Sequence, residues 1–561
     1  QAIALKPGYA EAFYNRGVAL QELKCPDEAV ASYNQAIALK PGYVEAFNNR
    51  AVALRDVMRW DEALASCSQA IALKPGYAEA FNNRGTVLEG MDRLDEALAS
   101  YDEAIRLKPD YADAIGNRGT VLKDQAHLDE ALAAFRTALD LDPSNAGIHS
   151  NLLFNLHYRE PYEPQAIFAE HRNWAGRHAS PQRLALAGID RDPDKRLRIG
   201  YVSADLRTHS VSFFLEPLLA ARDRGAFDVI CYANSLTADT TTARLQALAE
   251  GWRHIGNLDD EQAAAVVQAD AIDILVDLSG HTPGNRLTLF SRKPAPIQVT
   301  YLGYPDTSGV DAIDYRFTDE WADPPGRTEQ FHTEKLVRLP QGFLCYLPPA
   351  SCPPVSPLPM LQEGHVTFGS FNNLAKVSPT IVGHWAAILA AIPGSRLLLK
   401  SKALAGNGAR EHLRQQFRTH GIDAERVELI GWTLDRDDHM NLYGKMDIAL
   451  ETFPYHGTTT SCDALWMGVP VITLAGPVHV SRVGVSLLHA VGLDEMIAET
   501  PADYLLKAVN LAGDAVRLGA LRSTLRERMR ASPLTDARRI AGSVEDAYRQ
   551  MWRRFCQGSP P

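Results

Sequence analysis

Five prolines spaced 34 residues apart constrain the fold of this chain more than any other feature of its sequence. They are Pro7, Pro41, Pro75, Pro109 and Pro143. Around them the string Ala-Ile-Ala-Leu-Lys-Pro-Gly-Tyr recurs at 2–9, 36–43 and 70–77, with a close variant at 104–111. A fixed period of this length indicates a repeat array in which each unit packs only on its neighbours. We expect that array to cover residues 1–145.

Small residues recur in the same register. They are Gly17, Ala51, Gly85 and Gly119 in the first predicted helix of each unit, and Ala29, Ala63, Ala97 and Ala131 in the second. Small side chains at these positions let two amphipathic helices approach closely. A 34-residue period with paired helices is the pattern of the tetratricopeptide repeat. We therefore predict an α-superhelical tetratricopeptide array.

An asparagine also recurs in register, at Asn15, Asn49, Asn83, Asn117 and Asn151. An amide both donates and accepts, so such a ladder can hydrogen-bond the main chain of an extended peptide. Repeat arrays bind partners along a concave face. The alternative is that each asparagine satisfies a neighbouring helix end. We predict protein or peptide binding along this ladder.

Composition narrows the class of protein. The net charge of −11 argues against nucleic acid or an anionic membrane as the main partner. The seven cysteines are scattered and form no CxxC pair, which indicates a reducing compartment and no structural zinc. No run of about 18 apolar residues occurs, so we expect no membrane span. These features predict a cytoplasmic protein.

The remainder of the chain alternates short apolar runs with helical stretches, which predicts two mainly parallel α/β domains. The predicted parts are a degenerate closing repeat or helical linker at 146–194, a first α/β domain at 195–347, a proline-rich linker at 348–361, a second α/β domain at 362–530, and a helix crossing back to the first half at 531–561. Strands are expected at 197–203, 228–233, 272–278, 296–301, 335–339, 366–370, 396–400, 426–430, 447–450 and 470–474. Two such halves separated by a cleft are the GT-B architecture of nucleotide-sugar transferases, whose ligands lie at the carboxyl ends of the strands.

The stretch 451–468 carries the strongest local indication of chemistry. It passes from a buried strand through Pro454 and Gly457 into a helix, and three threonines stand where the helix begins. A helix start presents unpaired backbone N–H groups, so this place suits an anion such as a phosphate. Capping the helix would require only one of these hydroxyl residues.

Several motifs resemble those of the O-linked N-acetylglucosamine transferases, in a bacterial version with tetratricopeptide repeats. They are Gly-Tyr-Val-Ser-Ala-Asp at 200–205 with His209, the string Pro-Ala-Pro-Ile-Gln-Val-Thr-Tyr-Leu-Gly-Tyr-Pro-Asp-Thr-Ser-Gly at 294–309, Phe-Asn-Asn-Leu-Ala-Lys at 371–376, His439, and Gly-Thr-Thr-Thr-Ser-Cys-Asp at 457–463. The resemblance covers essentially the whole chain, and the 294–309 string is its most specific part.

The resemblance implies transfer of N-acetylglucosamine from UDP-GlcNAc to serine or threonine hydroxyls of proteins, with inversion at the anomeric carbon, no cofactor and no catalytic metal. A departing UDP gains negative charge on its β-phosphate, and a fixed cation with N–H donors stabilises it there. We assign the cation to Lys376 and the donors to Thr459 and Thr460. The predicted UDP and phosphate contacts are Asn373, Lys376, Arg436, His439, Thr458, Thr459, Thr460 and Asp463, and the predicted sugar pocket contains Gly303, Pro305 and Arg286.

His209 occupies the family's proposed general-base position, and a histidine suits proton removal near neutral pH. It can equally orient the acceptor or the sugar, and the sequence leaves both roles open. Asp239 is a second candidate for the proton. The chain departs from the animal members at four site positions: Asn373, Ala375 and Thr458 replace glutamine, tyrosine and histidine, and Arg436 replaces the usual lysine. These departures bear on the donor more than on the class of reaction.

Two alternatives follow from the same sequence. Close plant relatives with this architecture transfer fucose from GDP-fucose, and spacing does not separate the two donors. The other alternative is a repeat scaffold that binds nucleotide without transfer, against which Lys376, His209 and Asp463 argue. Metal-dependent transferases place an Asp-x-Asp motif at a strand end beside the cleft, and the pairs at 140–142, 192–194 and 435–437 are not expected there. A homodimer through upstream repeats also stays open.

Overall fold

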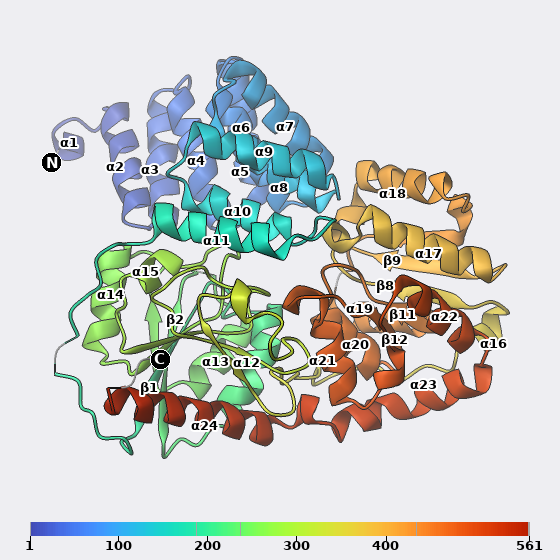
Figure 1. Ribbon diagram of the computed structural model, residues 1–561. Helices are drawn as coiled ribbons and strands as arrows, with labels where there is room; N and C mark the ends of the chain where they lie inside the picture. Colours follow the sequence, from blue (N-terminus) through green and yellow to red (C-terminus); the bar gives the residue numbers. More distant parts are fainter. Residues whose placement is uncertain (1, 187, 236, 434, 559–561) are drawn as a thin grey trace. The chain divides into compact units, whose positions relative to one another are not determined.

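The computed structural model describes residues 2–186, 188–235, 237–433 and 435–558 (Figure 1). By its internal contacts the chain forms two compact units, residues 1–148 with 402–411, and residues 149–401 with 412–561. The repeats lie in the first unit, and both β-sheets lie in the second. Among the described residues, no helix combines the length and the apolar character that crossing a bilayer requires.

The first unit confirms the repeat prediction. A short helix, α1 (Ala2–Leu5), precedes four helix pairs: α2 (Ala10–Glu22) with α3 (Pro26–Leu39), α4 (Val44–Asp56) with α5 (Trp60–Leu73), α6 (Ala78–Gly90) with α7 (Leu94–Leu107), and α8 (Ala112–Asp124) with α9 (Leu128–Leu141). The glycines of the first helices face aromatic rings of the second: a Cβ on Gly17 would lie 2.5 Å from the Tyr33 ring, and one on Gly85 would lie 2.5 Å from that of Tyr101. Close approach therefore requires the small residues that recur in the sequence.

One segment of the first unit comes from far along the chain. Lys402 Nζ lies 2.6 Å from Asp92 Oδ1, and the backbone N–H of Gly408 donates to Asp95 Oδ2 at 3.3 Å. Gln125 holds the other oxygen of Asp95 at 2.6 Å. Residues 402–411 therefore pack with the repeats, although in sequence they follow a strand of the second sheet. No local pattern of the sequence indicates this packing.

The second unit contains a first lobe built on a seven-stranded parallel sheet, in the order β3-β2-β1-β4-β5-β6-β7. Its strands are β1 (Leu197–Ser203), β2 (Phe227–Ala233), β3 (Gly251–His254), β4 (Ile274–Asp277), β5 (Ile297–Thr300), β6 (Tyr315–Thr318) and β7 (Lys335–Arg338). The strand order reverses between β1 and β4, and ligands of open α/β sheets gather beside such a switch point.

The second lobe is built on a six-stranded parallel sheet in the order β10-β9-β8-β11-β12-β13. Its strands are β8 (Thr367–Ser370), β9 (Arg396–Lys400), β10 (Val427–Ile430), β11 (Ile448–Leu450), β12 (Val471–Leu474) and β13 (Ile497–Ala498). Here the switch point lies between β8 and β11. Residues that follow these two strands therefore meet at one edge of the sheet.

Helices connect the strands of both lobes. They are α10 (Ala146–Leu156) and α11 (Pro164–His178) ahead of β1, then α12 (Ser210–Ala221), α13 (Thr240–Leu248), α14 (Asp260–Ala269) and α15 (Leu287–Ser291) in the first lobe, and α16 (Met360–Glu363), α17 (Pro379–Ala391), α18 (Asn407–Thr419), α19 (Arg436–Leu442), α20 (Thr459–Trp466), α21 (Val483–Ala490), α22 (Pro501–Ala512) and α23 (Ala515–Arg530) afterwards. Figure 1 shows the second sheet between α17 and α23. The short turns η1 to η8 lie in the loops.

The last helix, α24 (Ala537–Cys556), returns to the first lobe (Figure 1). The hydroxyls of Tyr548 and Tyr201 lie 3.2 Å apart, and Trp552 donates from Nε1 to the carbonyl of Asp192 at 2.8 Å. Its amphipathic pattern predicted a crossing helix over about 535–555, and the structure shows that crossing.

The ten predicted strands are all present, with ends within two residues of those expected. The sequence reading missed β3, β6 and β13. The first two have four residues each and are interrupted by polar residues, while β13 has only two residues. In β6 a buried arginine, Arg316, interrupts the apolar pattern. Tertiary pairing therefore makes strands where local propensity is weak.

Candidate active site

The turn after β11 leads directly into α20 and confirms that the three threonines stand at a helix start. Thr458 is the N-cap residue, and the first intrahelical bond runs from Cys462 N to the Thr458 carbonyl at 3.0 Å. The N–H groups of the residues between them have no carbonyl partner within the helix. Within the part of the chain that the structure describes, the buried Thr459 hydroxyl also has no partner. This helix start therefore offers several donors to an anion.

Lys376 reaches this turn from the loop after β8, at the end of the 3-10 turn η2 (Leu374–Lys376). Its Nζ donates to the His456 carbonyl at 2.8 Å and lies 4.1 Å from the centre of the Tyr455 ring. Burial lowers the pKa of Lys376 to about 8, and the charge of Glu451 opposes that lowering. The side chain therefore supplies an ammonium group next to α20 at neutral pH.

Asp463 lies one turn into α20 and is buried. Its carboxylate accepts a hydrogen bond from the Tyr346 hydroxyl. Arg436 approaches one oxygen at 3.7 Å, and His439 Nε2 approaches the other at 3.5 Å. The structure thus brings two of the predicted nucleotide-site residues, Arg436 and His439, to the carboxylate of a third, Asp463.

The outer side of this cluster contains Lys400, at the carboxyl end of β9. Its Nζ lies 2.8 Å from His439 Nδ1. Arg436 stacks 4.1 Å over the Phe213 ring, which comes from α12 of the first lobe. Asn373 caps η2 by accepting from Ala375 N at 3.1 Å, and its side chain is exposed. Residues from both lobes therefore line this side.

Several site residues were missed by the sequence reading. Glu451 and Asn372 are buried beneath the start of α20 and bond to one another at 2.9 Å. Lys400 and Tyr346 reach the Asp463 cluster. Glu451 and Lys400 could have been found because each is polar and ends an apolar strand. No local pattern marks Tyr346, because it reaches Asp463 from another lobe.

His209 caps α12 in the first lobe. Its Nδ1 accepts from the Val211 N–H at 3.3 Å and lies 3.7 Å from Asp205 Oδ2. Burial lowers the pKa of His209, and the charge of Asp205 opposes this. In the neutral ring an accepting Nδ1 leaves the proton on Nε2. The other ring nitrogen, Nε2, is therefore a hydrogen-bond donor in this arrangement.

Asp239 is placed as a helix cap. One carboxylate oxygen accepts from Thr242 N at 2.9 Å in a capping box at the start of α13, and the other accepts from Thr208 N at 2.7 Å. Burial alone would raise the pKa of Asp239, but hydrogen bonds from Thr208 and Thr242 lower it to about 2. A carboxylate this acidic is a poor proton acceptor near neutral pH. The structure therefore gives Asp239 a place as a structural cap, and its part in proton transfer stays a prediction.

Arg286 has partners other than those predicted. Its guanidinium donates to the Leu258 carbonyl at 3.0 and 3.1 Å, approaches Asn234 Oδ1 at 3.4 Å, and pairs with Asp260 Oδ1 at 3.1 Å. These contacts occupy both terminal nitrogens, so a sugar contact would have to replace one of them. In the structure Arg286 bridges segments of the first lobe, and its place in a sugar pocket stays a prediction.

Gly303 and Pro305 lie in the loop after β5. A Cβ on Gly303 would lie 1.9 Å from the Leu278 carbonyl oxygen, so only glycine fits. Between them Tyr304 is buried, and its hydroxyl lies 2.8 Å from His157 Nε2 and 2.9 Å from His171 Nε2. Helix α11 and the residue that follows α10 therefore hold this loop in place.

The hydrogen bonds around Tyr304 have one consistent direction. His171 Nδ1 meets the Ile167 carbonyl at 2.8 Å and must donate, so its Nε2 accepts from the Tyr304 hydroxyl. The Tyr304 oxygen then accepts from His157 Nε2, and His157 Nδ1 accepts from the Tyr162 hydroxyl at 2.8 Å. Burial lowers the pKa of His171 to about 4, which keeps this chain neutral.

The same two histidines, together with Asp306, are the one group among the described residues with the spacing of metal ligands. Their donor atoms lie within 4.8 Å of one another. Both imidazole Nε2 atoms already face the Tyr304 hydroxyl, so a cation would have to displace that group. Two of the Asp-x-Asp pairs have structural uses: Asp435 caps α19, and Asp194 pairs with Arg553 at 2.7 Å.

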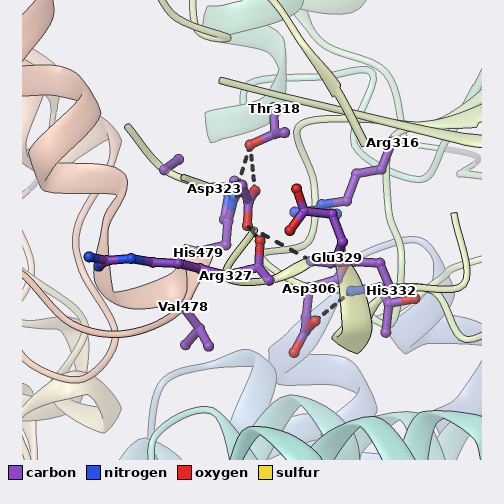
Figure 2. A network of polar contacts seen from close by, with 12 residues as sticks. Asp306, Arg316, Thr318, Asp323, Arg327, Glu329, His332, Val478 and His479 are labelled. Carbon is purple, nitrogen blue, oxygen red and sulfur yellow. Dashed lines mark hydrogen bonds and ion pairs between the residues drawn. The ribbon is translucent and has the colours of Figure 1, made fainter. Parts of the chain in front are cut away.

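A buried polar network joins the two lobes (Figure 2). Asp323 accepts from His479 Nδ1 at 2.6 Å and from the Thr318 hydroxyl at 2.5 Å. Burial alone would raise the pKa of Asp323, but the charge of His479 holds it far below its usual range. Arg316, labelled in the same view, donates to the Tyr304 carbonyl at 2.9 Å. The network therefore supports the loop that carries Gly303 and Pro305.

The asparagine ladder of the first unit is hydrogen-bonded within the array. Asn83 donates to Asn48 at 2.9 Å and Asn117 donates to Asn82 at 3.0 Å, each to the preceding repeat. Asn49 donates to the Tyr14 hydroxyl at 3.1 Å, while Asn15 is exposed and Asn151 lies in the second unit. Each bond uses one of two amide hydrogens. At Asn83 and Asn117 the second amide hydrogen and the oxygen remain for a ligand, whereas the Asn49 oxygen already accepts from Asn48 Nδ2 at 3.3 Å.

Two parallel-sheet lobes, with candidate nucleotide-site residues after strands of the second, define a GT-B-type transferase fold. Comparison with protein families is consistent with this class. The family model described as glycosyl transferase family 41 matches residues 182–346 and 358–544, and tetratricopeptide models match 10–43, 78–111 and 112–145. The chain belongs to glycosyl transferase family 41.

Known proteins resemble both the sequence and the structure. A Petunia hybrida protein named "Probable UDP-N-acetylglucosamine--peptide N-acetylglucosaminyltransferase SPINDLY" is 44% identical over 422 residues, which are 74% of this chain and 45% of that protein. The Arabidopsis thaliana protein of the same description named SEC is 35% identical over 382 residues, 65% of this chain and 38% of the relative. The chain spans less than half the length of these relatives.

A solved structure covers nearly the whole chain. The structure of a mutant O-GlcNAc transferase of Thermobaculum terrenum matches with a TM-score of 0.88 and 37% identity, over 92% of this chain and 98% of the other. The O-GlcNAc transferase of Thermobaculum terrenum therefore has a similar architecture to that of this chain.

Proposed function

We propose that the protein is an inverting, metal-independent glycosyltransferase that moves N-acetylglucosamine from UDP-GlcNAc to serine or threonine hydroxyls of proteins. The observation that carries this proposal is the convergence of Lys376 with the open start of α20, one helical turn before the buried Asp463 carboxylate. A cation and N–H donors suit a diphosphate, and the carboxylate suits ribose hydroxyls. The names of the relatives and of the solved structure, which specify N-acetylglucosamine, support the choice of sugar, and those of the relatives support a peptide acceptor.

In the proposed reaction the acceptor hydroxyl oxygen forms a bond to the anomeric carbon as the bond from that carbon to the β-phosphate oxygen breaks. UDP leaves with the electron pair of the broken bond, and the acceptor hydroxyl loses its proton. Lys376 and the α20 N–H groups gain most from the charge that develops on the departing phosphate. Because these groups supply positive charge themselves, we propose that transfer proceeds without a metal.

We assign His209 a positioning role in this reaction. Its Nδ1 accepts a hydrogen bond from the Val211 N–H. The ring proton is therefore on Nε2, which acts as a hydrogen-bond donor and not as a proton acceptor. A donor at this place can hold an acceptor carbonyl or a sugar oxygen.

The acceptor protein is proposed to bind along the repeats. The asparagines at 83 and 117 each keep one amide hydrogen beyond their contacts in the array. All seven cysteines are free thiols, which supports a reducing, cytoplasmic location.

Two assays, both with EDTA present, test this proposal. A transfer assay compares UDP-GlcNAc with GDP-fucose as donors, with a mixture of proteins as acceptors. Calorimetry compares the binding of UDP with that of GDP. We expect GlcNAc transfer and tight UDP binding under these conditions. Fucose transfer with GDP binding would replace the proposed donor, loss of transfer in EDTA would overturn metal independence, and nucleotide binding without transfer would favour a scaffold.

A further inference from the structure

One peptide group connects the predicted phosphate lysine to a buried carboxylate. Lys376 Nζ donates to the carbonyl oxygen of His456 at 2.8 Å. On the other side of the same peptide bond, the N–H of Gly457 donates to Glu451 Oε1 at 2.8 Å. The peptide between residues 456 and 457 is therefore held between an ammonium and a carboxylate. It immediately precedes the N-cap of α20.

Glu451 binds this whole region together. It follows β11 directly and is 2% exposed. Besides Gly457, its carboxylate accepts from its neighbour Thr452 N at 3.0 Å, from Asn372 Nδ2 at 2.9 Å and from Ser461 Oγ at 2.5 Å. These donors come from the loop after β8, from the turn before α20 and from the first turn of α20. One carboxylate thus fixes the relative positions of three segments.

The packing leaves little freedom in this arrangement. Asn372, which donates to Glu451, accepts from the Thr460 hydroxyl at 3.0 Å through its other amide atom. A Cβ on Gly457 would lie 2.6 Å from Asn372 Oδ1 and 2.6 Å from Thr460 Oγ1. Only glycine therefore fits at the bridging peptide. Hydrogen bonds of Glu451 and of its partner Asn372 therefore hold the turn from which the N–H groups of α20 project.

We propose that Glu451 is a positioning residue of the donor site: its carboxylate fixes the turn that aims α20 at the diphosphate, and its charge, acting through the peptide it shares with Lys376, keeps that lysine an ammonium. The inference rests on the proposed function, because it deepens the role of the diphosphate site. Glu451 itself is buried behind the turn and does not touch the substrate.

The charges around Lys376 agree with this role. Burial lowers the pKa of Lys376 to about 8, and the charge of Glu451 is the opposing influence. The Tyr455 ring and His456 also face the lysine, and burial lowers the pKa of His456 to about 4, so that imidazole is neutral. Arg482 lies near His456 and carries a positive charge, as Lys376 does. Removing the carboxylate therefore moves the Lys376 pKa downward.

The chain offers a matched control at the other end of the same strand. Asp447 directly precedes β11, is buried, and accepts backbone N–H bonds from Met360 at 2.9 Å and Thr367 at 2.8 Å. Like Glu451 it is a strand-end carboxylate, but it lies at the amino end, away from α20. Asp447→Asn therefore measures how losing a buried carboxylate affects the second lobe in general, apart from any effect on α20 and Lys376.

The experiment measures kcat/KM for transfer as a function of pH, over about pH 6 to 10. It compares the wild type with the variants Glu451→Gln, Glu451→Asp, Ser461→Ala and Asp447→Asn. Wild-type activity should fall as pH rises through about 8, as Lys376 loses its proton. In Glu451→Gln this limb should move about one pH unit lower. Glu451→Asp and Ser461→Ala keep the charge, so the limb should stay while the rate falls.

Two results would overturn the proposal. One is an unchanged alkaline limb in Glu451→Gln, and the other is the same shift in Asp447→Asn. If Glu451→Gln does not fold, Glu451→Asp decides the positioning role, which an unchanged rate in that variant would exclude.

Competitive acetylation of Lys376 as a function of pH, read by mass spectrometry, measures the pKa of Lys376 in the free protein without any donor. A shifted acetylation profile with no sugar transfer would therefore reject the proposed function and keep the role of Glu451.

Discussion

The two lobes of the second unit place their predicted site residues at the same kind of position but use them differently. In the second lobe, Lys376 and Asp463 contact other site residues, and α20 keeps unbonded donors. In the first lobe, His209 and Asp239 accept backbone N–H groups as helix caps, and Arg286 donates to a backbone carbonyl. A strand-end position therefore predicts where a polar residue lies. Its hydrogen bonds decide whether it is free to act.

The largest effect that follows from this contrast is at Lys376. Lys376→Ala removes the one cation next to α20 that we assign to the β-phosphate, and we expect kcat to fall by about 10²- to 10³-fold. Transfer kinetics and thermal unfolding measure the effect, with little change expected in stability. Lys445→Ala is the control, since that exposed lysine pairs with Glu428 at 3.8 Å on the surface. Near-normal activity in Lys376→Ala would remove the basis for contrasting the lobes.

A smaller but still large effect is expected at Asp463. Asp463→Asn keeps the shape of the side chain but removes the charge that faces Arg436 and His439. We expect UDP affinity to weaken by about 10- to 100-fold, because hydrogen bonds to a charged group are among the strongest that a ligand makes. Calorimetry measures it. Unchanged affinity would show that the cluster serves the fold and not the nucleotide.

The His209 variants separate a donor from a base. His209→Gln retains an outward N–H donor, and we expect activity within about tenfold of the wild type, whereas His209→Ala should lose about 10²-fold. His209→Asn is the matched variant, because it retains an acceptor for Val211 N but not the outward donor. If glutamine and alanine reduce kcat equally, the histidine acts as a proton acceptor, and the first lobe contributes chemistry after all.

The smallest effect on activity is expected at Asp239. Asp239→Ala should change the transfer rate by less than about twofold but cost about 1 kcal/mol of stability through loss of the α13 cap. Urea unfolding measures the second effect. The pKa of Asp239 is lowered, so its stabilisation is present above its ordinary pKa near 3.8 and is lost as the pH falls through about 2. A large loss of rate with normal stability would return Asp239 to the reaction.

Much of the fold was predictable because the relevant interactions are local or periodic. The 34-residue spacing predicted the helix pairs, and apolar runs predicted ten strands with nearly correct ends. What the sequence did not indicate are contacts of single side chains with distant segments. Nothing adjacent to Arg286 in sequence indicates that Leu258 and Asp260 hold its guanidinium, and nothing near residue 402 indicates its contact with Asp92.

By itself the sequence determined the repeat array, the two parallel sheets, and a helix start with three hydroxyl residues at residues 458–460, since these depend on period, apolar runs and local turn chemistry. The tertiary structure decided which polar groups stay free. Glu451 gains its role only because β8 and β11 are neighbours in the sheet, which brings Asn372, the 456–457 peptide and Ser461 to one carboxylate. Hydrogen bonds between segments distant in sequence depend on strand order, and a local pattern does not encode them.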